Sequence, residues 1–291
     1  MTDQQWDMRG RVCVVTGATS GIGRATALGL ARLGAQVVMV ARDPRRGEAA
    51  RAEIARESGN TTVEVLRADL SVQGDIRRLA AEVTARHPRL HVLVNNAGGL
   101  YSRRATTADG LETTFALNVL APFLLTDLLR PALEAAAPAR VITVASSLHA
   151  RASVNFDDLQ GERRYRPLLG AYAQSKLAVV LLTYELARRL EGTGVTVNVA
   201  DPGSVRTNVF ANTSGALALL MRLGSPFYQT PEQGAQTLLY LAASPEVSGV
   251  SGRYFAKAKE TASSPASHER ATAARLWEVA TRLTAGRRDN A

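Results

Sequence analysis

A tyrosine and a lysine stand four residues apart in a chain that contains few lysines. The 35 basic residues include only three lysines, and Tyr172 is the only one of 7 tyrosines with a lysine four positions later. In a helix, positions i and i+4 lie on one face, so Lys176 would sit beside Tyr172. A tyrosine with an ordinary pKa of about 10 exchanges protons near neutral pH only when a nearby positive charge stabilises its phenolate. The pair therefore predicts an acid/base site.

Two further polar residues stand where a predicted strand ends or where an apolar helix face is interrupted. Ser147 follows the predicted strand 141–144, so its hydroxyl could donate to a substrate carbonyl. The alternative is a turn or cap serine, which is the usual role of a serine at a strand end. Asn118 interrupts an apolar helical stretch, and a buried amide must find hydrogen-bond partners.

A glycine-rich turn follows the first predicted strand. Residues 16–23 read TGATSGIG, between a β-rich run at 12–16 and a helical pattern at 24–33. Glycines let the backbone turn tightly and approach a pyrophosphate, and the N–H groups at the helix start attract its negative charge. The alternative is an ordinary strand-to-helix turn. The predicted dinucleotide contacts in this turn are Gly17, Thr19, Ser20, Gly21, Ile22 and Gly23.

The end of the second predicted strand discriminates between the two nicotinamide cofactors. An NAD site would have an acid there for the ribose 2′-hydroxyl. Arg42 suits a 2′-phosphate instead, because its guanidinium forms charge-assisted, bidentate hydrogen bonds. Asp43 is the rival, but an Asp followed by Pro44 is typical of a helix N-cap. The sequence therefore favours NADP(H).

Two more strand ends complete the predicted cofactor site. Asp69 and Leu70 follow the third strand and could contact the adenine, although Asp69 could also cap the next helix. A loop of small residues follows the fourth strand and could approach a cofactor closely; its predicted contacts are Asn96, Ala97 and Gly98. We expect no metal ligand in this site.

Apolar runs and amphipathic stretches alternate along the whole chain, which is typical of a parallel α/β sheet. The predicted strands are 12–16, 37–40, 62–66, 92–94, 141–144, 195–199 and 253–255. The predicted helices are 24–33, 45–57, 76–86, 111–129, 172–190 and 231–242. Right-handed crossovers place helices on both faces, so we expect a single domain, 1–291, with a doubly wound, Rossmann-type, parallel seven-stranded sheet. Ligands of such sheets bind at the carboxyl ends of the strands, where all the motifs above fall.

The composition bounds the partners and the compartment. The 35 basic and 26 acidic residues give a net charge of +9, but the arginines are spread along the chain, so we expect no nucleic-acid partner. Cys13 is the only cysteine, so no internal disulfide can form. The longest uncharged stretch, 207–221, is shorter than the ~20 residues of a spanning helix, and residues 1–10 contain no apolar signal-peptide core. We expect a cytoplasmic protein without a transmembrane anchor.

Together these residues resemble the short-chain dehydrogenase/reductase family of the classical type. Residues 16–23 resemble its TGxxxGxG turn, Asn96 to Gly98 its NAG motif, and Tyr172 with Lys176 its YxxxK pair. A further resemblance is to the PG motif beneath the nicotinamide, carried by Pro202, Gly203, Val205 and Thr207. The resemblance covers nearly the whole chain and implies the same Rossmann-type fold.

The resemblance also implies a catalytic tetrad of Asn118, Ser147, Tyr172 and Lys176. Tyr172 would exchange the proton, and Lys176 would lower the pKa of Tyr172 and hold the nicotinamide ribose. Ser147 would orient the substrate carbonyl, and Asn118 would support a proton-relay water. The hydride would move between the nicotinamide and the substrate carbon.

Several strings are similar to the retinol dehydrogenase and WW-domain-containing oxidoreductase branch of this family: 107–110 (TADG), 156–162 (FDDLQGE) and 251–255 (SGRYF). The long separation of 25 positions between Ser147 and Tyr172 also matches that branch. Arg42 agrees with the branch's preference for NADP. Asp201 departs from the pattern, because the branch commonly has His before its Pro-Gly.

Two remaining segments complete the expected architecture. We expect residues 204–230 to form a substrate lid, apolar enough to cover an apolar substrate or to touch a membrane surface. We expect a helical tail at 257–291, packed on the domain or on a partner subunit of a homo-oligomer.

The expected function is NADP(H)-dependent interconversion of an alcohol and its aldehyde or ketone, on an apolar or polycyclic small-molecule substrate. A ketoreductase that tailors secondary metabolites shares every motif and stays an alternative. A nucleotide-sensing binding protein without turnover is the alternative from another class, but such a protein should have lost Tyr172 or Lys176, and this chain has both.

Overall fold

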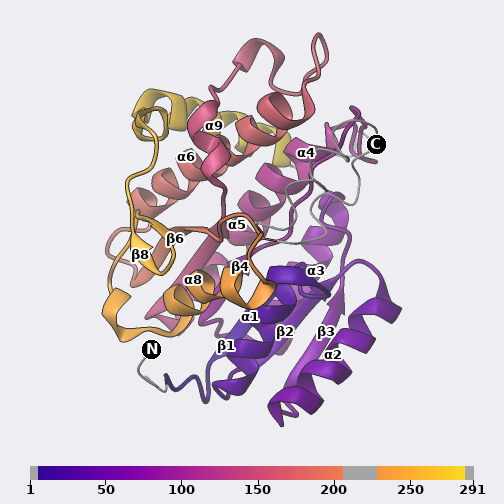
Figure 1. Ribbon diagram of the computed structural model, residues 1–291, viewed down its shortest axis with the longest axis vertical. Coiled ribbons are helices and arrows are strands. Elements are labelled where there is room, and N and C mark those ends of the chain that lie inside the picture. The colour runs from indigo at the N-terminus through magenta and orange to yellow at the C-terminus, as the bar shows by residue number, and fades with distance from the viewer. Residues whose placement is uncertain (1–5, 206–227, 286–291) are drawn as a thin grey trace.

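The computed structural model, which describes residues 6–205 and 228–285, contains one eight-stranded sheet in the order β3-β2-β1-β4-β5-β6-β7-β8 (Figure 1). All neighbouring strands from β3 to β7 are parallel. The strand order reverses between β1 and β4, and open α/β sheets bind ligands in the crevice at such a reversal. The strands are β1 (Val12–Thr16), β2 (Gln36–Ala41), β3 (Val63–Arg67), β4 (Val92–Asn95), β5 (Ala139–Val144), β6 (Val195–Asp201), β7 (Tyr254–Ala256) and β8 (Lys259–Glu260).

The predicted seven parallel strands are confirmed, with one strand added at the edge. β8 has two residues and pairs antiparallel with β7 through a turn at Lys257 and Ala258. These turn residues have φ values of 51° and 54°, a conformation that usually selects Gly, Asn or Asp. Because neither residue type signals such a turn, this strand was not predicted.

Helices cover both faces of the sheet, as the alternating sequence pattern predicts. One face carries α1 (Gly21–Arg32), α2 (Pro44–Ser58) and α8 (Pro231–Ala243), whose buried side chains share one apolar core with the strands. The other face carries α3 (Gln73–Arg86), α5 (Ala121–Ala136) and α6 (Ala173–Arg189). The arrangement leaves the carboxyl ends of the strands to the loops that carry the predicted site.

The predicted helix 111–129 is divided into three parts. It begins with α4 (Thr113–Phe115), because the Glu112 side chain accepts from the backbone N–H groups of Thr114 and Phe115. A π-helical turn (Ala116–Leu120) then leads into α5. The combined stretch Thr113–Ala136 has 24 residues and contains an 18-residue window with a mean hydropathy of 1.3, so by length and composition it could cross a membrane. Within the fold, 61% of its most apolar 18-residue window is buried, and the apolar residues of α5 pack against the sheet and α3.

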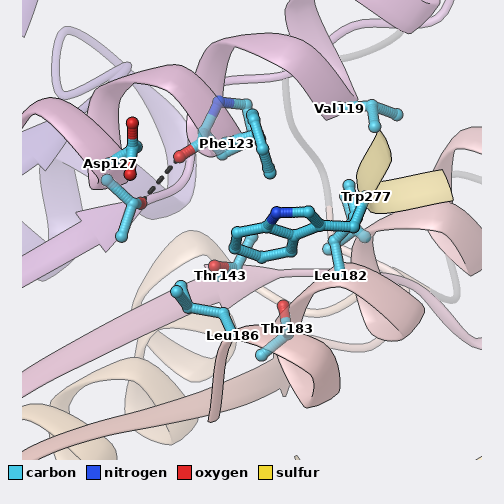
Figure 2. A pocket seen from close by; sticks show the side chains of 11 residues that line it. Val119, Phe123, Asp127, Thr143, Leu182, Thr183, Leu186 and Trp277 are labelled. Atoms are coloured by element: carbon cyan, nitrogen blue, oxygen red, sulfur yellow. Dashed lines mark hydrogen bonds between the residues drawn. The ribbon is translucent and has the colours of Figure 1, made fainter. Parts of the chain in front are cut away.

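The C-terminal helix α9 (Arg270–Thr284) packs on its own domain, against α6. Trp277 of α9 contacts Phe123 of α5 edge-on, with ring centroids 4.8 Å apart, and the Arg189 guanidinium lies 4.3 Å from the Trp277 ring. Figure 2 shows Trp277 and Phe123 at an apolar gap between these helices. The gap has a volume of about 30 Å³. This volume suits about one water, and the described lining contains no predicted site residue. The gap is therefore a packing feature of the α9 interface.

Candidate active site

The predicted proton-transfer pair is buried at the start of α6. A π-helical turn (Pro167–Tyr172) runs directly into α6, so Tyr172 and Lys176 lie on consecutive turns of one helical face. Tyr172 is 7% exposed and Lys176 is 4% exposed. The Lys176 Nζ lies 5.7 Å from the centre of the Tyr172 ring. The structure therefore brings the two residues together as predicted.

The charge state of this pair follows from its burial. Lys176 Nζ donates to the carbonyl oxygen of Val144, at the end of β5, over 2.8 Å. Burial lowers the pKa of Lys176 to about 8, although the charge of Asp201 opposes this shift. Burial also raises the pKa of Tyr172, and Asp201 adds to that rise. Desolvation dominates both pKa shifts, and the predicted lowering of the Tyr172 pKa by Lys176 stays a prediction. At neutral pH the site holds an ammonium beside a phenol.

The serine that meets Tyr172 is Ser146, one residue before the predicted Ser147. The Ser146 side chain hydrogen-bonds the Tyr172 side chain, and Ser146 Oγ also accepts from the N–H of Leu148 at 3.3 Å. Ser147 is exposed and begins a short 3-10 helix (Ser147–Arg151). The predicted contact of Ser147 with a substrate carbonyl stays a prediction, and the sequence does not mark which of two adjacent serines bonds Tyr172.

Asn118 connects the loop after β4 to the segment that carries Tyr172. Its Oδ1 accepts from the N–H of Gly99 at 2.8 Å, and its Nδ2 donates to the Gly99 carbonyl at 3.1 Å and to Ser175 Oγ at 3.0 Å. Ser175 Oγ donates in turn to the Tyr172 carbonyl at 2.7 Å. Through these bonds the Asn118 amide holds the two segments together. Its predicted link to a relay water stays a prediction. Asn118 and Tyr172 both lie in π-helical turns, which occur frequently at functional sites.

Close packing explains the glycines in the turn between β1 and α1. Gly17 has a φ of 67°, and a Cβ on it would lie 3.0 Å from the Ala97 Cα. A Cβ on Gly23 would lie 2.3 Å from the Gly17 carbonyl oxygen. Asn96 Nδ2 donates to the Thr16 carbonyl at 2.8 Å, and Thr16 Oγ1 accepts from the N–H groups of Asn96 and Ala97 at 2.9 and 3.0 Å. The two predicted cofactor loops are thus fastened to each other.

The start of α1 suits an anionic group. The Ser20 side chain forms no cap bond to the helix, and the first turn contains no acidic residue. Thr19 and Ser20 are half-buried, and Gly21 has a φ of 55°. N–H groups at a helix start carry positive partial charge, which favours a phosphate. The residues present therefore fit the pyrophosphate of a dinucleotide.

Two charged residues follow β2: Arg42, and Asp43, whose carboxylate already accepts hydrogen bonds within the fold. The predicted N-cap role of Asp43 is confirmed, because its Oδ1 accepts from the N–H groups of Arg45 and Arg46 at 2.9 and 3.1 Å. Arg42 is exposed and forms no ion pair within the described residues. Its charge opposes the rise that burial gives to the pKa of Tyr101, in the loop after β4. The predicted contact of Arg42 with a 2′-phosphate stays a prediction.

Asp69 forms a local turn and does not cap a helix. Its Oδ1 accepts from the N–H of Ser71 at 2.9 Å and from Ser71 Oγ at 2.7 Å, and the residue at the N-cap of α3 is Val72. The helix-cap alternative for Asp69 is therefore wrong. Leu70 is buried, and the adenine contact of both residues stays a prediction.

The predicted PG segment lies beside the start of α1. A Cβ on Gly234 of α8 would lie 2.6 Å from Val205 and 3.2 Å from Ile22, so these two side chains border each other. Pro202 is half-buried, and Gly203 has a φ of 77°. Thr207 and most of the expected lid at 204–230 lie outside the described residues.

A polar groove of about 310 Å³ lies between α4 and the loop that precedes Tyr172. Gln174 lines it, and this residue projects from α6 in a direction opposite to Tyr172 and Lys176. The two acids that line the groove, Glu112 and Asp158, accept hydrogen bonds from backbone N–H groups. The groove is therefore separate from the proton-transfer pair.

Comparisons with known proteins place this geometry in a family. Residues 11–217 match the family described as short chain dehydrogenase. Human retinol dehydrogenase 14 is 44% identical over 288 residues, which cover 94% of this chain and 85% of that protein.

Solved structures agree with this result. An uncharacterized protein from Mycobacterium paratuberculosis is 32% identical, covers 96% of both chains and superposes with a TM-score of 0.78. RhlG from Pseudomonas aeruginosa, in an active-site complex with NADP, is 29% identical over 86% of this chain and 95% of its own, with a TM-score of 0.68. The chain therefore belongs to the short chain dehydrogenase family and is an oxidoreductase of the kind that uses a nicotinamide dinucleotide.

Proposed function

We propose that the chain reduces an apolar aldehyde or ketone to the alcohol with NADPH, with Tyr172 as the proton donor. The observation that carries this proposal is the buried Tyr172 phenol, hydrogen-bonded to Ser146 and accompanied by the Lys176 ammonium. The named relative at 44% identity acts on retinol, an apolar alcohol, which supports this substrate class. The apolar composition of residues 204–230 agrees with it.

Each residue of the site has a separate task in this reaction. A bound nicotinamide supplies the hydride to the carbonyl carbon. The Ser146 hydroxyl donates to the carbonyl oxygen and so fixes its position next to Tyr172. Tyr172 gives its phenolic proton to that oxygen as negative charge develops there. Lys176 stabilises the phenolate that is left on Tyr172. Alcohol oxidation uses the same groups in reverse.

Adjacent serine variants test the assignment of Ser146. Ser146→Ala is expected to lower kcat/KM for the reduction of retinal by about 10²-fold, because it removes a hydrogen-bond donor aimed at the reacting oxygen. Ser147→Ala is the matched control and should stay within about twofold of the wild type, since Ser147 is exposed. Steady-state kinetics with NADPH measures both. A larger loss in Ser147→Ala than in Ser146→Ala contradicts the assignment.

The preference for NADP(H) rests on Arg42 and on the occupied carboxylate of Asp43. Arg42→Ala is expected to weaken NADPH binding about 10- to 100-fold, the usual effect of losing hydrogen bonds to a charged partner. NADH binding should change by less than about twofold, because NADH lacks the 2′-phosphate. Fluorescence titration of both cofactors measures the two constants.

Arg45→Ala provides the control for this titration, since it removes the same charge from the first turn of α2. It should leave the preference for NADPH intact. Wild-type protein that binds NADH more tightly than NADPH overturns the cofactor assignment but leaves the oxidoreductase class standing.

Compartment and assembly belong to the same proposal. A single cysteine, Cys13, that is buried and free is compatible with the reducing cytoplasm. We infer a cytoplasmic enzyme that acts on small molecules. Assembly into a homo-oligomer is part of the same proposal.

A further inference from the structure

A buried carboxylate that the proposed reaction does not use lies at the end of β6. Asp201 is 6% exposed. Its Oδ2 accepts from the Tyr254 hydroxyl at 2.7 Å, and its Oδ1 accepts from the N–H of Gly203 at 2.9 Å. Two donors aimed at its two oxygens are the partners that an ionised carboxylate requires. Asp201 therefore keeps a negative charge inside the fold.

The strand register places this charge next to the catalytic pair. β5 and β6 pair in register with Val144 opposite Ala200, and the N–H of Ala145 donates to the Ala200 carbonyl at 2.9 Å. The next residue on β6 is Asp201. On the β5 side, the Val144 carbonyl holds the Lys176 ammonium, and Ser146 follows Ala145. Asp201 thus lies on the strand next to β5, beside the Val144 carbonyl that holds Lys176 and the Ser146 that bonds Tyr172.

The other titratable groups around Asp201 do not neutralise it. His149 Nε2 accepts from the N–H of Ser264 at 3.1 Å, so its Nδ1 carries the proton and donates to the Ser146 carbonyl at 2.8 Å. A ring with one accepting nitrogen is uncharged. Tyr254 of β7 donates to Asp201, and Tyr184 of α6 acts on Tyr254.

The remaining neighbours bring no further buried charge. Lys257 follows Ala256, the register partner of Asp201, but is exposed. The buried residues of α8 contain no titratable group: Gly234, Ala235, Thr237, Leu238, Leu241 and Ala242. Among the described residues, Lys176 is the only buried Lys or Arg.

We propose that Asp201 is a positioning residue whose buried charge keeps Lys176 an ammonium and Tyr172 a phenol, and so favours carbonyl reduction over alcohol oxidation. The directions of the shifts agree with this role, because Asp201 raises the pKa of both Tyr172 and Lys176. Reduction needs the protonated phenol, whereas oxidation needs the phenolate. The statement about direction rests on the proposed function, but the statement about Lys176 does not.

Because the chain contains only three lysines, the effect of the Asp201 charge on the pKa of Lys176 can be measured without substrate or cofactor. Protein labelled with ¹³C at lysine Cε should give three resonances, and Lys257→Arg and Lys259→Arg assign the Lys176 resonance by elimination. We expect the Lys176 resonance to titrate near pH 8 in the wild type. Asp201→Asn has the same shape without the charge, and it should move this titration down by ~1 pH unit.

Tyr254→Phe separates the charge of Asp201 from its hydrogen bonds. This variant removes the Tyr254 donor but leaves the carboxylate, so Lys176 should titrate as in the wild type. An unchanged titration in Asp201→Asn overturns the proposal, and so does an equal shift in both variants. Asp201→Ser also removes the charge and gives the same test if the Asn variant does not fold.

The pH profile of turnover then tests the effect on direction. At pH 7, Asp201→Asn should increase the rate of alcohol oxidation up to about tenfold. Lowering the pKa of Tyr172 by about one pH unit gives about ten times more phenolate. The high-pH limit of reduction should move down by the same amount. Profiles that keep their position while the rates fall assign Asp201 a purely structural role and overturn the proposal. Absence of turnover with a shifted Lys176 titration instead rejects the proposed function and leaves the charge effect standing.

Discussion

Tyr172→Phe is expected to lower kcat for carbonyl reduction by about 10²- to 10⁴-fold, the usual contribution of a positioned general acid. The phenylalanine keeps the ring in its buried position and removes only the proton that reduction consumes. NADPH binding should stay within about threefold, because the substitution removes one uncharged hydroxyl and no charge. Stopped-flow oxidation of NADPH with a saturating aldehyde measures the chemical step.

Tyr184→Phe is the matched control for this variant. Tyr184 lies on the same helix, and its hydroxyl bonds Ser263 at 2.8 Å, away from the proton-transfer pair. It should retain turnover within about threefold while losing about 1 kcal/mol of stability from the missing hydrogen bond. Turnover of Tyr172→Phe at the wild-type rate contradicts the acid role of Tyr172.

Lys176→Met is expected to lower kcat/KM by about 10²-fold or more, since the phenolate that forms on Tyr172 loses the cation beside it. Methionine fills similar volume in this buried position. Removing a buried charge that forms no direct ion pair among the described residues should leave the thermal midpoint unchanged or higher. Reduction by the wild type should decline as the pH rises through about 8, where the ammonium loses its proton, and the Lys176→Met variant should lack this limb.

Two further lysine variants distinguish the charge from its geometry. Lys176→Arg keeps the charge but should not restore activity, because a planar guanidinium does not match the single bond to the Val144 carbonyl at this site. Lys259→Met removes an exposed lysine and should have no effect on turnover. Full activity of Lys176→Arg would show that any cation suffices and contradict the geometric part of the account.

The core of the fold could be predicted because buried parallel strands appear in the sequence as short apolar runs. The run at 12–16 coincides with β1, and the other six predicted strands lie within about two residues of those in the structure. Asp43 followed by Pro44 correctly marked the start of α2. β8 could not be predicted, because its pairing depends on a turn built from Lys257 and Ala258 in an unusual conformation.

The site was predictable where spacing alone determines contact. The spacing of Tyr172 and Lys176 sufficed because a helix converts it directly into a shared face. The choice between Ser146 and Ser147 depends on how the chain leaves β5, which no local pattern encodes. Asp201 was noted only as a departure from the family pattern. Its position at the end of a largely buried strand was the available signal of a buried charge.

The central claim is that this chain transfers a hydride from NADPH to a carbonyl carbon under proton donation by Tyr172. The most direct measurement is deuterium transfer from NADPH deuterated at C4 to a panel of aliphatic, aromatic and isoprenoid aldehydes and ketones, followed by mass spectrometry of the alcohols. We predict that the product gains deuterium from one C4 epimer of the cofactor and not from the other, and that Tyr172→Phe yields no labelled alcohol in the same time. NADPH binding without deuterium in any product would contradict the account and identify a nucleotide-binding protein without turnover.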